Sequence, residues 1–362
     1  MNHTYHHFMK WLGAKHPKIK CLGKCIYNLK KDDFVQDILG GSKRPALFTI
    51  HSYGDKNADK LIYLEEILSS GAGFFDQHRR LLETLCLCDI LHAVPVVHYS
   101  TNFTYYETGG VNGVYNGFEY YFEPLSRISY ENVLCSKYVI KAQPEHRVFA
   151  WDNLQYLQAK CGQDYVSKYY EEEDPIRLDH REVYFKTLAA IQRKYIRLKP
   201  SVKELIYHDI HRLFGRDKVI GVHARGTDFK THNKNCPVYV EPEIHMEEVR
   251  KVIDQYDKVF LATDNSESME LFKKAFGSKL ICFDEVFRAD GGSEGVHYMR
   301  RTNRECHKYL LGLEVLRDMT ALSECDALVA GISGVSCMAH VNKLSQGKDY
   351  GYLRFINKGF YQ

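Results

Sequence analysis

VIGVHARGTDFK, residues 219 to 230, is the stretch of sequence that decides the fold of the C-terminal half. Its apolar start, with Val219, Ile220 and Val222, is typical of a buried strand. His223 and Arg225 follow two residues apart, so both side chains project to one face at the strand's end. The stretch therefore predicts a buried strand whose carboxyl end presents polar groups to a ligand.

Three further apolar runs of strand length lie downstream, at residues 258–264 (KVFLATD), 279–285 (KLICFDE) and 326–333 (DALVAGIS). Segments with apolar residues at helical spacing separate them; Pro242 begins one, Gly277 ends another, and the longest carries Val315 and Met319. Strands that alternate with helices predict a parallel sheet covered on both faces, the Rossmann-like arrangement.

The sequence upstream predicts a domain boundary near residue 200. Pro200 is expected to end one helix, and Ser201 with Glu204 matches a capping box for the next. We therefore expect an N-terminal α/β domain over 1–200 that binds an acceptor, and a C-terminal Rossmann-like domain over 201–362. In the N-terminal part we expect strands within 46–52 and 94–100, and mostly helix over 61–91.

Composition indicates a folded globular protein of about two domains. The 362 residues include 49 basic and 46 acidic ones, a net charge of +3 with both signs interleaved, which argues against a nucleic-acid binder. No signal-peptide-length apolar run and no run of 18 apolar residues occurs, so we expect a cytoplasmic protein with at most peripheral contact with the inner face of the membrane. The 11 cysteines are expected as reduced thiols, without a metal site.

The polar groups at the strand ends suit a nucleotide. The Arg225 guanidinium, beside Gly226, fits a bidentate grip on phosphate, the alternative being a surface ion pair with Asp228. Asp264 can accept from a guanine edge or from ribose hydroxyls, or it caps the following helix. Ser333 precedes a helix whose first N–H groups can bind an anion, unless the segment is an ordinary βα turn.

Taken together, these segments resemble the three motifs of the fucosyltransferase superfamily, which comprises α1,6-fucosyltransferases, including bacterial nodulation enzymes, and protein O-fucosyltransferases. The motifs are the HxR strand end, the ATD strand end and LSECDALVAGIS (residues 322–333), in the right order, and the resemblance covers residues 218–343. It implies a GT-B-type fold of two facing Rossmann-like domains with a central cleft, a GDP-fucose donor, inversion at the anomeric carbon, and no metal or other cofactor.

The resemblance also implies roles for particular residues. Arg225 would hold the β-phosphate and neutralise the leaving GDP, while His223 and Asp264 would contact the guanine. The rest of the expected donor site is Gly226, Ser333, Gly334, Val335 and Ser336.

Two departures from the family pattern stand out. The α1,6-fucosyltransferases commonly have a second arginine where this chain has Gly226. The carboxylate that some members use as a catalytic base has no clear counterpart. Asp228 and His232 are the candidates for this base, in addition to the catalytic role of Arg225, and a group of the N-terminal domain is the alternative.

No Asp-x-Asp triplet is present to hold a diphosphate through a metal, so positive charge must take that role. For the acceptor we expect residues of the N-terminal half, whose aromatic-rich segment over 103–122 either stacks on a sugar or forms core. The candidate acceptor residues are Phe74, Asp76, Arg79, Asn116 and Glu119.

These observations predict a transferase that moves fucose from GDP-fucose to a glycan or lipid-linked glycan acceptor, in cell-surface polysaccharide or glycoconjugate synthesis. Two alternatives stay open. One is a GT-B transferase that uses another nucleotide sugar, and the other is a non-catalytic nucleotide-binding or protein-interaction module.

Overall fold

A computed structural model describes residues 49–143, 146, 182–226, 237–289, 304–359 and 361. The described chain divides into two compact units, each with its own sheet. Unit 1 comprises 49–68, 83–97, 125–143 and 146, and unit 2 comprises 69–82, 98–124 and the described residues from 182 onward. The α/β class expected from the sequence is confirmed, whereas the facing arrangement of two domains stays a prediction.

Unit 1 holds a sheet in the order β1-β4-β2-β3. The strands are β1 (Ile50–His51), β2 (Ile62–Glu66), β3 (Val94–His98) and β4 (Val139–Lys141), and a short helix is α5 (Tyr130–Val133). β4 pairs antiparallel with β1 and parallel with β2. Its core is built from buried aliphatic side chains of β2, β3, β4 and α5: Ile62, Leu64, Val96, Val133 and Val139.

Two strand expectations are confirmed here and one helix expectation is wrong in part. The region 61–91 contains strand β2 before helix α4 (Phe74–Leu91) begins. The segment around β2, LIYLEEIL, has leucines and isoleucines at helical spacing, but pairing with β4, more than 70 residues away in the chain, fixes it as a strand.

The sheet of unit 2 is wholly parallel, in the order β7-β6-β5-β8-β9. Its strands are β5 (Val219–His223), β6 (Lys258–Ala262), β7 (Leu280–Ile281), β8 (Ala327–Gly331) and β9 (Tyr352–Ile356). The first four are the strands predicted from the sequence. β9 was not predicted, because Arg354 interrupts its short apolar pattern at the edge of the sheet.

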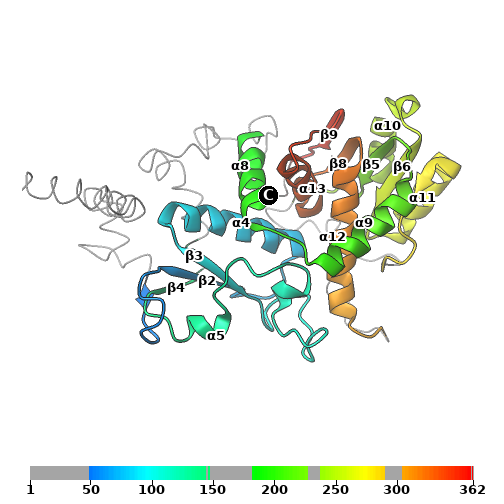
Figure 1. Ribbon diagram of the computed structural model, residues 1–362. Coiled ribbons are helices and arrows are strands. Elements are labelled where there is room, and N and C mark those ends of the chain that lie inside the picture. The colour runs from blue at the N-terminus through cyan, green and yellow to red at the C-terminus, as the bar shows by residue number, and fades with distance from the viewer. Residues whose placement is uncertain are drawn as a thin grey trace, which may run out of the picture. The chain divides into compact units, whose positions relative to one another are not determined.

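Helices cover both faces of this sheet, as predicted (Figure 1). On one face, α10 (Pro242–Arg250) and α11 (Ser266–Phe276) bury Met246, Val249 and Phe272 against the strands. On the other face lie α9 (Pro200–Phe214) and α12 (His307–Glu324). Phe214 of α9 packs edge-on against Phe260 of β6. The remaining elements are α8 (Glu182–Tyr195), α13 (Gly334–Ser345), and the 3-10 turns η1 (Gly117–Tyr120), η5 (Ile253–Gln255) and η6 (Gly277–Lys279).

The predicted capping box at Ser201 and Glu204 does not form. Helix α9 begins at Pro200, with Lys199 as N-cap and no side-chain cap bond. Proline has the helical φ built in and no N–H to satisfy, so it fits the first helical position and places Ser201 inside the helix.

The division into units also differs from the expected boundary at residue 200. Segments 69–82 and 98–124 belong to unit 2 with the C-terminal residues. Tyr121 donates a hydrogen bond from its hydroxyl to the Tyr309 carbonyl at 2.9 Å, and Glu107 accepts one from the Tyr309 N–H at 3.1 Å. Long-range contacts therefore join residues on both sides of position 200.

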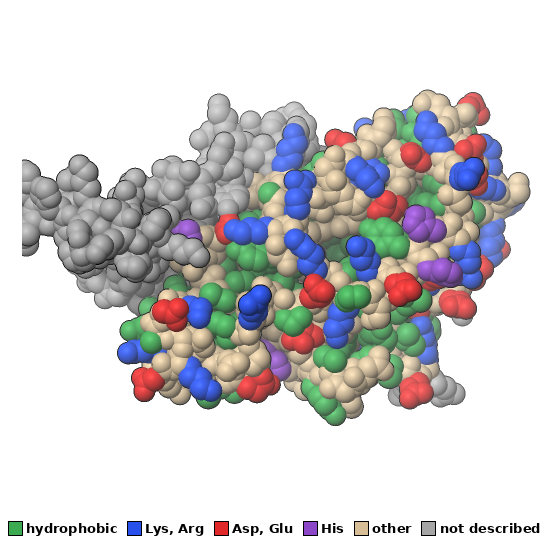
Figure 2. Space-filling model, viewed as in Figure 1, with side chains coloured by type: hydrophobic (Ala, Val, Ile, Leu, Met, Phe, Trp, Pro, Cys, Tyr) green, Lys and Arg blue, Asp and Glu red, His purple; other side chains and the backbone are tan. Residues whose placement is uncertain are grey.

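The surface carries both charges. On the face shown in Figure 2, basic and acidic side chains are interspersed over the described part of the chain. None of the helices formed by described residues has the length and apolar character needed to cross a membrane.

Candidate functional site

The site lies in unit 2, where two strands that are neighbours in the sheet are distant in the chain. From β5 the chain runs outward through β6 and β7, and it then returns to place β8 on the other side of β5. Ligands of open parallel sheets bind outside the carboxyl ends of the strands at such a switch point. His223 ends β5 and Ser333 follows β8, and the His223 Nδ1 lies 3.1 Å from the Ser333 Oγ. Two of the three motifs therefore meet at this point.

His223 is neutral in the folded protein. Burial, and to a smaller extent the Arg225 cation, lowers its pKa to about 3, although the Asp264 carboxylate partly opposes the change. With Nδ1 bonded to Ser333, the Nε2 has no hydrogen-bond partner among the described residues. A neutral imidazole of this kind suits a hydrogen bond to a ligand better than a charge interaction.

Asp264 connects the second motif to the first. Its Oδ1 accepts a hydrogen bond from the Gly226 N–H at 2.8 Å, and its Oδ2 lies 3.5 Å from the Arg225 Nε. Asn265, not Asp264, caps helix α11 by accepting from the Ser268 N–H at 2.8 Å. The cap alternative for Asp264 is therefore wrong, and the carboxylate instead orients the loop that carries Arg225.

Gly226 is required by close packing. A Cβ added there would lie 2.6 Å from the Cβ of Asn265, closer than such atoms approach in proteins. The second arginine of the α1,6-fucosyltransferases therefore has no room at this position with the backbone as it stands. The departure seen in the sequence has a steric basis.

The third motif begins helix α13. Ser333 is the N-cap, its Oγ accepts from the Ser336 N–H at 3.2 Å, and the Ser336 Oγ accepts from the Ser333 N–H at 3.0 Å. The Ser336 hydroxyl also donates to the Gly331 carbonyl at 2.7 Å, so this buried side chain holds the turn. In the described part of the chain, the N–H groups of Gly334 and Val335 have no partner, as expected at a helix start that can bind an anion.

The first turn of α4 lies beside the start of α13. A Cβ added to Gly334 would lie 3.3 Å from the Phe75 Cβ and 3.4 Å from the Asp76 backbone nitrogen. The Asp76 carboxylate is held by Arg79 at 2.9 Å and Arg80 at 2.8 Å. Asp76, and Arg79 through its ion pair with Asp76, thus lie next to the start of α13, and their binding of an acceptor stays a prediction.

The other candidate acceptor residues have structural roles. The Asn116 Oδ1 accepts from the Tyr99 N–H at 2.9 Å, and its Nδ2 donates to the Glu119 Oε1 at 2.8 Å. Phe74 is buried, and so is most of the aromatic segment that follows: Phe103, Tyr105, Phe118, Tyr120, Tyr121 and Phe122. The core alternative accounts for these rings, and acceptor binding by Asn116 or Glu119 stays a prediction.

Two candidate residues for proton transfer, Asp228 and His232, lie outside the described residues. The structure places other titratable groups near the strand ends that sequence reasoning missed. Burial raises the pKa of Asp318 on α12 to about 7, against the effect of Arg288 and Arg317. Burial likewise lowers the pKa of His245 on α10 to about 4. Both residues lie in ordinary amphipathic helices, so no sequence signal distinguishes them.

The part of the chain that the structure describes contains no group of three or more His, Cys, Asp or Glu side chains that could hold a metal ion. The strand-end site, defined as His223, Arg225, Gly226, Asp264, Ser333, Gly334 and Val335, instead offers one guanidinium, two free amides and one neutral imidazole. This set can bind an anion such as a diphosphate.

Comparison with known proteins gives similar structures but no similar sequences. No protein-family model matches the chain, and no curated protein matches it. The fucosyltransferase NodZ from Bradyrhizobium is 15% identical, with 78% of this chain and 92% of that chain covered and a TM-score of 0.43. POFUT1 in complex with GDP-fucose is 12% identical, with 83% of this chain and 99% of that chain covered and a TM-score of 0.46.

Proposed function

We propose that the chain is a glycosyltransferase that moves fucose from GDP-fucose to a glycan acceptor, with inversion and without a metal. The observation that carries the proposal is the junction of His223 and Ser333 at the switch point, 3.1 Å apart, with Arg225 and Asp264 alongside. Arg225 thus supplies a cation, and the start of helix α13 supplies backbone amides, at the position where open parallel sheets bind nucleotides.

In this reaction the acceptor hydroxyl attacks the anomeric carbon, its proton passes to a base, and the bond from that carbon to the β-phosphate oxygen breaks as GDP leaves. Negative charge grows on the diphosphate during bond breaking. Arg225 and the N–H groups of Gly334 and Val335 are fixed before the reaction, so they stabilise this charge more in the transition state than in the ground state. That is how a site with no Asp-x-Asp triplet would work without a divalent ion.

The partly exposed Arg225 is positioned by Asp264, whose carboxylate also accepts from the Gly226 N–H. An arginine held in this way loses less side-chain entropy when the diphosphate arrives. The same carboxylate would accept from the guanine N1 and N2 hydrogens if the base binds beside β6, as the resemblance implies.

The test is calorimetric binding of GDP, UDP and ADP to the full chain and to Arg225→Lys, together with the donor turnover of both. We expect GDP alone to bind, and Arg225→Lys to lower donor turnover about a hundredfold while GDP affinity falls less, because lysine lacks the planar fork that grips the leaving diphosphate. Arg216→Lys is the matched control, since Arg216 is an exposed residue outside the site.

Donor turnover in excess EDTA tests the metal-free mechanism, and it should equal turnover without EDTA. UDP or ADP binding in place of GDP would indicate another nucleotide sugar. The absence of any nucleotide binding would indicate a non-catalytic module and would contradict the proposal.

A further inference from the structure

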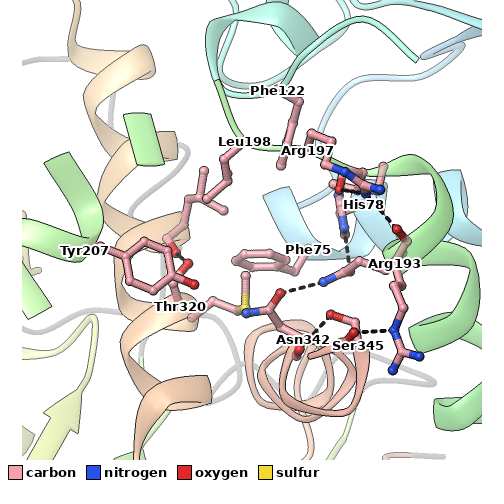
Figure 3. A pocket seen from close by; sticks show the side chains of 14 residues that line it. Phe75, His78, Phe122, Arg193, Arg197, Leu198, Tyr207, Thr320, Asn342 and Ser345 are labelled. Atoms are coloured by element: carbon pink, nitrogen blue, oxygen red, sulfur yellow. Dashed lines mark hydrogen bonds between the residues drawn. The ribbon is translucent and has the colours of Figure 1, made fainter. Parts of the chain in front are cut away.

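A cavity of unit 2 lies apart from the strand-end site. It has a volume of about 270 Å³, and its walls come from helices α4, α8, α9, α12 and α13. None of its lining residues belongs to the strand-end site. Figure 3 shows the side chains of Phe75, Leu198 and Tyr207 converging on this cavity.

The apolar part of the wall is made of large side chains, Phe75, Phe122, Ile196, Leu198, Leu316 and Met319. A cavity of this size is slightly smaller than the roughly 300–1,000 Å³ of most small-molecule sites. It therefore suits a small ligand with an apolar body.

The polar groups of the wall are mostly satisfied by one another. The His78 Nε2 lies 3.2 Å from the Gln192 Oε1, and the Gln192 Nε2 donates to the Asn342 Oδ1 at 2.7 Å (Figure 3). The Asn342 Nδ2 in turn donates to the Ser323 Oγ at 2.7 Å. Burial lowers the pKa of His78 to about 4, so this chain of hydrogen bonds is uncharged at neutral pH. It presents no charge that a ligand would need to neutralise.

The two arginines of the wall differ in their contacts. Arg193 is engaged, because its Nε donates to the Ser345 carbonyl at 2.5 Å and its Nη2 to the Leu344 carbonyl at 2.9 Å. Arg197 uses only its Nη1, which donates to the carbonyls of Arg193 and Ile196 at 2.7 Å each. Its Nε and Nη2 have no partner among the described residues, and no lining residue is acidic.

We propose that this cavity binds a small organic monoanion, a carboxylate on an aromatic or aliphatic body. The body would contact the apolar wall, and the carboxylate would accept two hydrogen bonds from the Nε and Nη2 of Arg197, the paired geometry that guanidinium groups favour. The hydrogen-bonded side chains of His78, Gln192 and Asn342 are uncharged, so they neither repel the anion nor need it to balance a charge. The inference rests on this cavity alone and does not depend on the proposed transferase activity.

The experiment is a ligand-observed NMR titration of the full chain with 3-phenylpropionate, and with 3-phenylpropylamine as a probe of the same shape and opposite charge. We expect saturable binding of the acid and none of the amine. Arg197→Gln should weaken binding of the acid at least tenfold. Arg216→Gln, the same change at an exposed arginine outside the cavity, should leave it unchanged.

Ile196→Trp provides an independent check, because a larger side chain at this half-buried wall position should fill the cavity and abolish binding, with circular dichroism reporting that the variant is folded. GDP should not displace the acid, since the two sites share no residue. The proposal is overturned if the wild-type chain does not bind the acid, if Arg197→Gln binds it as tightly, or if GDP competes with it.

Discussion

At the scale of single residues, the position after Arg225 shows how packing limits the chemistry of the site. The Gly226 backbone is fixed by the hydrogen bond from its N–H to Asp264 and by its contact with Asn265, which is fully buried. Neither neighbour can move away at low cost, because Asn265 caps helix α11 and Asp264 lies in the short link between strand β6 and that helix. A side chain at this position must therefore displace the loop that carries the arginine.

Gly226→Ala should consequently lower the free energy of unfolding by roughly 1–3 kcal/mol, the usual cost of overpacking, and should weaken GDP binding through the displaced Arg225. Chemical denaturation and calorimetry measure the two effects. Gly109→Ala is the control, since a Cβ there would meet nothing within 4 Å. If Gly226→Ala matched the wild type in both measurements, the steric explanation for the missing second arginine would be wrong.

At the scale of elements, one chain of hydrogen bonds joins four helices of unit 2. It runs from His78 of α4 through Gln192 of α8 and Asn342 of α13 to Ser323 of α12. His78 also stacks on Phe122, with ring centroids 5.4 Å apart. The helices are thus held by polar contacts that a protonated histidine would disturb, because a charge in this buried position is costly.

This arrangement predicts a particular pH dependence. The folded pKa of His78, about 4, is below that of an unfolded histidine, so between about pH 6.5 and 4 the unfolded chain binds a proton that the folded chain does not. The free energy of unfolding should therefore fall as the pH falls through this window, by about 1.4 kcal/mol per pH unit for this residue.

His78→Gln removes the titrating group and should make that slope shallower by the same amount, as measured by denaturation at several pH values. His211→Gln, at an exposed position of α9, is the matched control and should leave the slope unchanged. An unaltered slope in His78→Gln would show that His78 does not contribute. Burial also lowers the pKa values of His223 and His245. Both residues therefore add to the pH slope with the same sign as His78, and they do so equally in the two variants.

At the scale of the whole molecule, the chain passes repeatedly between the two units. Helix α4 is continuous, yet its first residues belong to unit 2 and its last to unit 1. Unit 2 also depends on residues before position 200, since Phe185 of α8 stacks on Phe355 and Tyr121 stacks on Tyr309 at 5.5 Å. The C-terminal sheet is therefore not a separately closed domain.

A fragment of residues 201–362 should accordingly lack a cooperative unfolding transition, because it leaves the partners of Phe185 and Tyr121 exposed. The fragment 182–362, which restores helix α8 and its packing against α13, should be more stable than the shorter one but less stable than the full chain. Thermal denaturation followed by circular dichroism compares the three. Cooperative unfolding of 201–362 at the temperature of the full chain would instead favour a boundary at residue 200.

The sequence by itself determined the features that depend on local pattern. Buried parallel strands appear as short runs of Val, Ile and Leu, so β5, β6 and β8 were predictable, as were Gly277 at the end of α11 and Ser333 at the start of α13. The motif residues at the strand ends follow directly, because parallel strands bring their carboxyl ends to one edge of the sheet.

The tertiary structure decided which groups meet. That Asp264 binds the Gly226 N–H and pairs with Arg225, and that the first turn of α4 lies beside Gly334, depends on segments far apart in the chain. The identity of β2 as a strand and of the aromatic segment as core likewise follows from distant partners. Local pattern reports how much of a side chain is buried, whereas the partner against which it is buried is set only when the whole chain has folded.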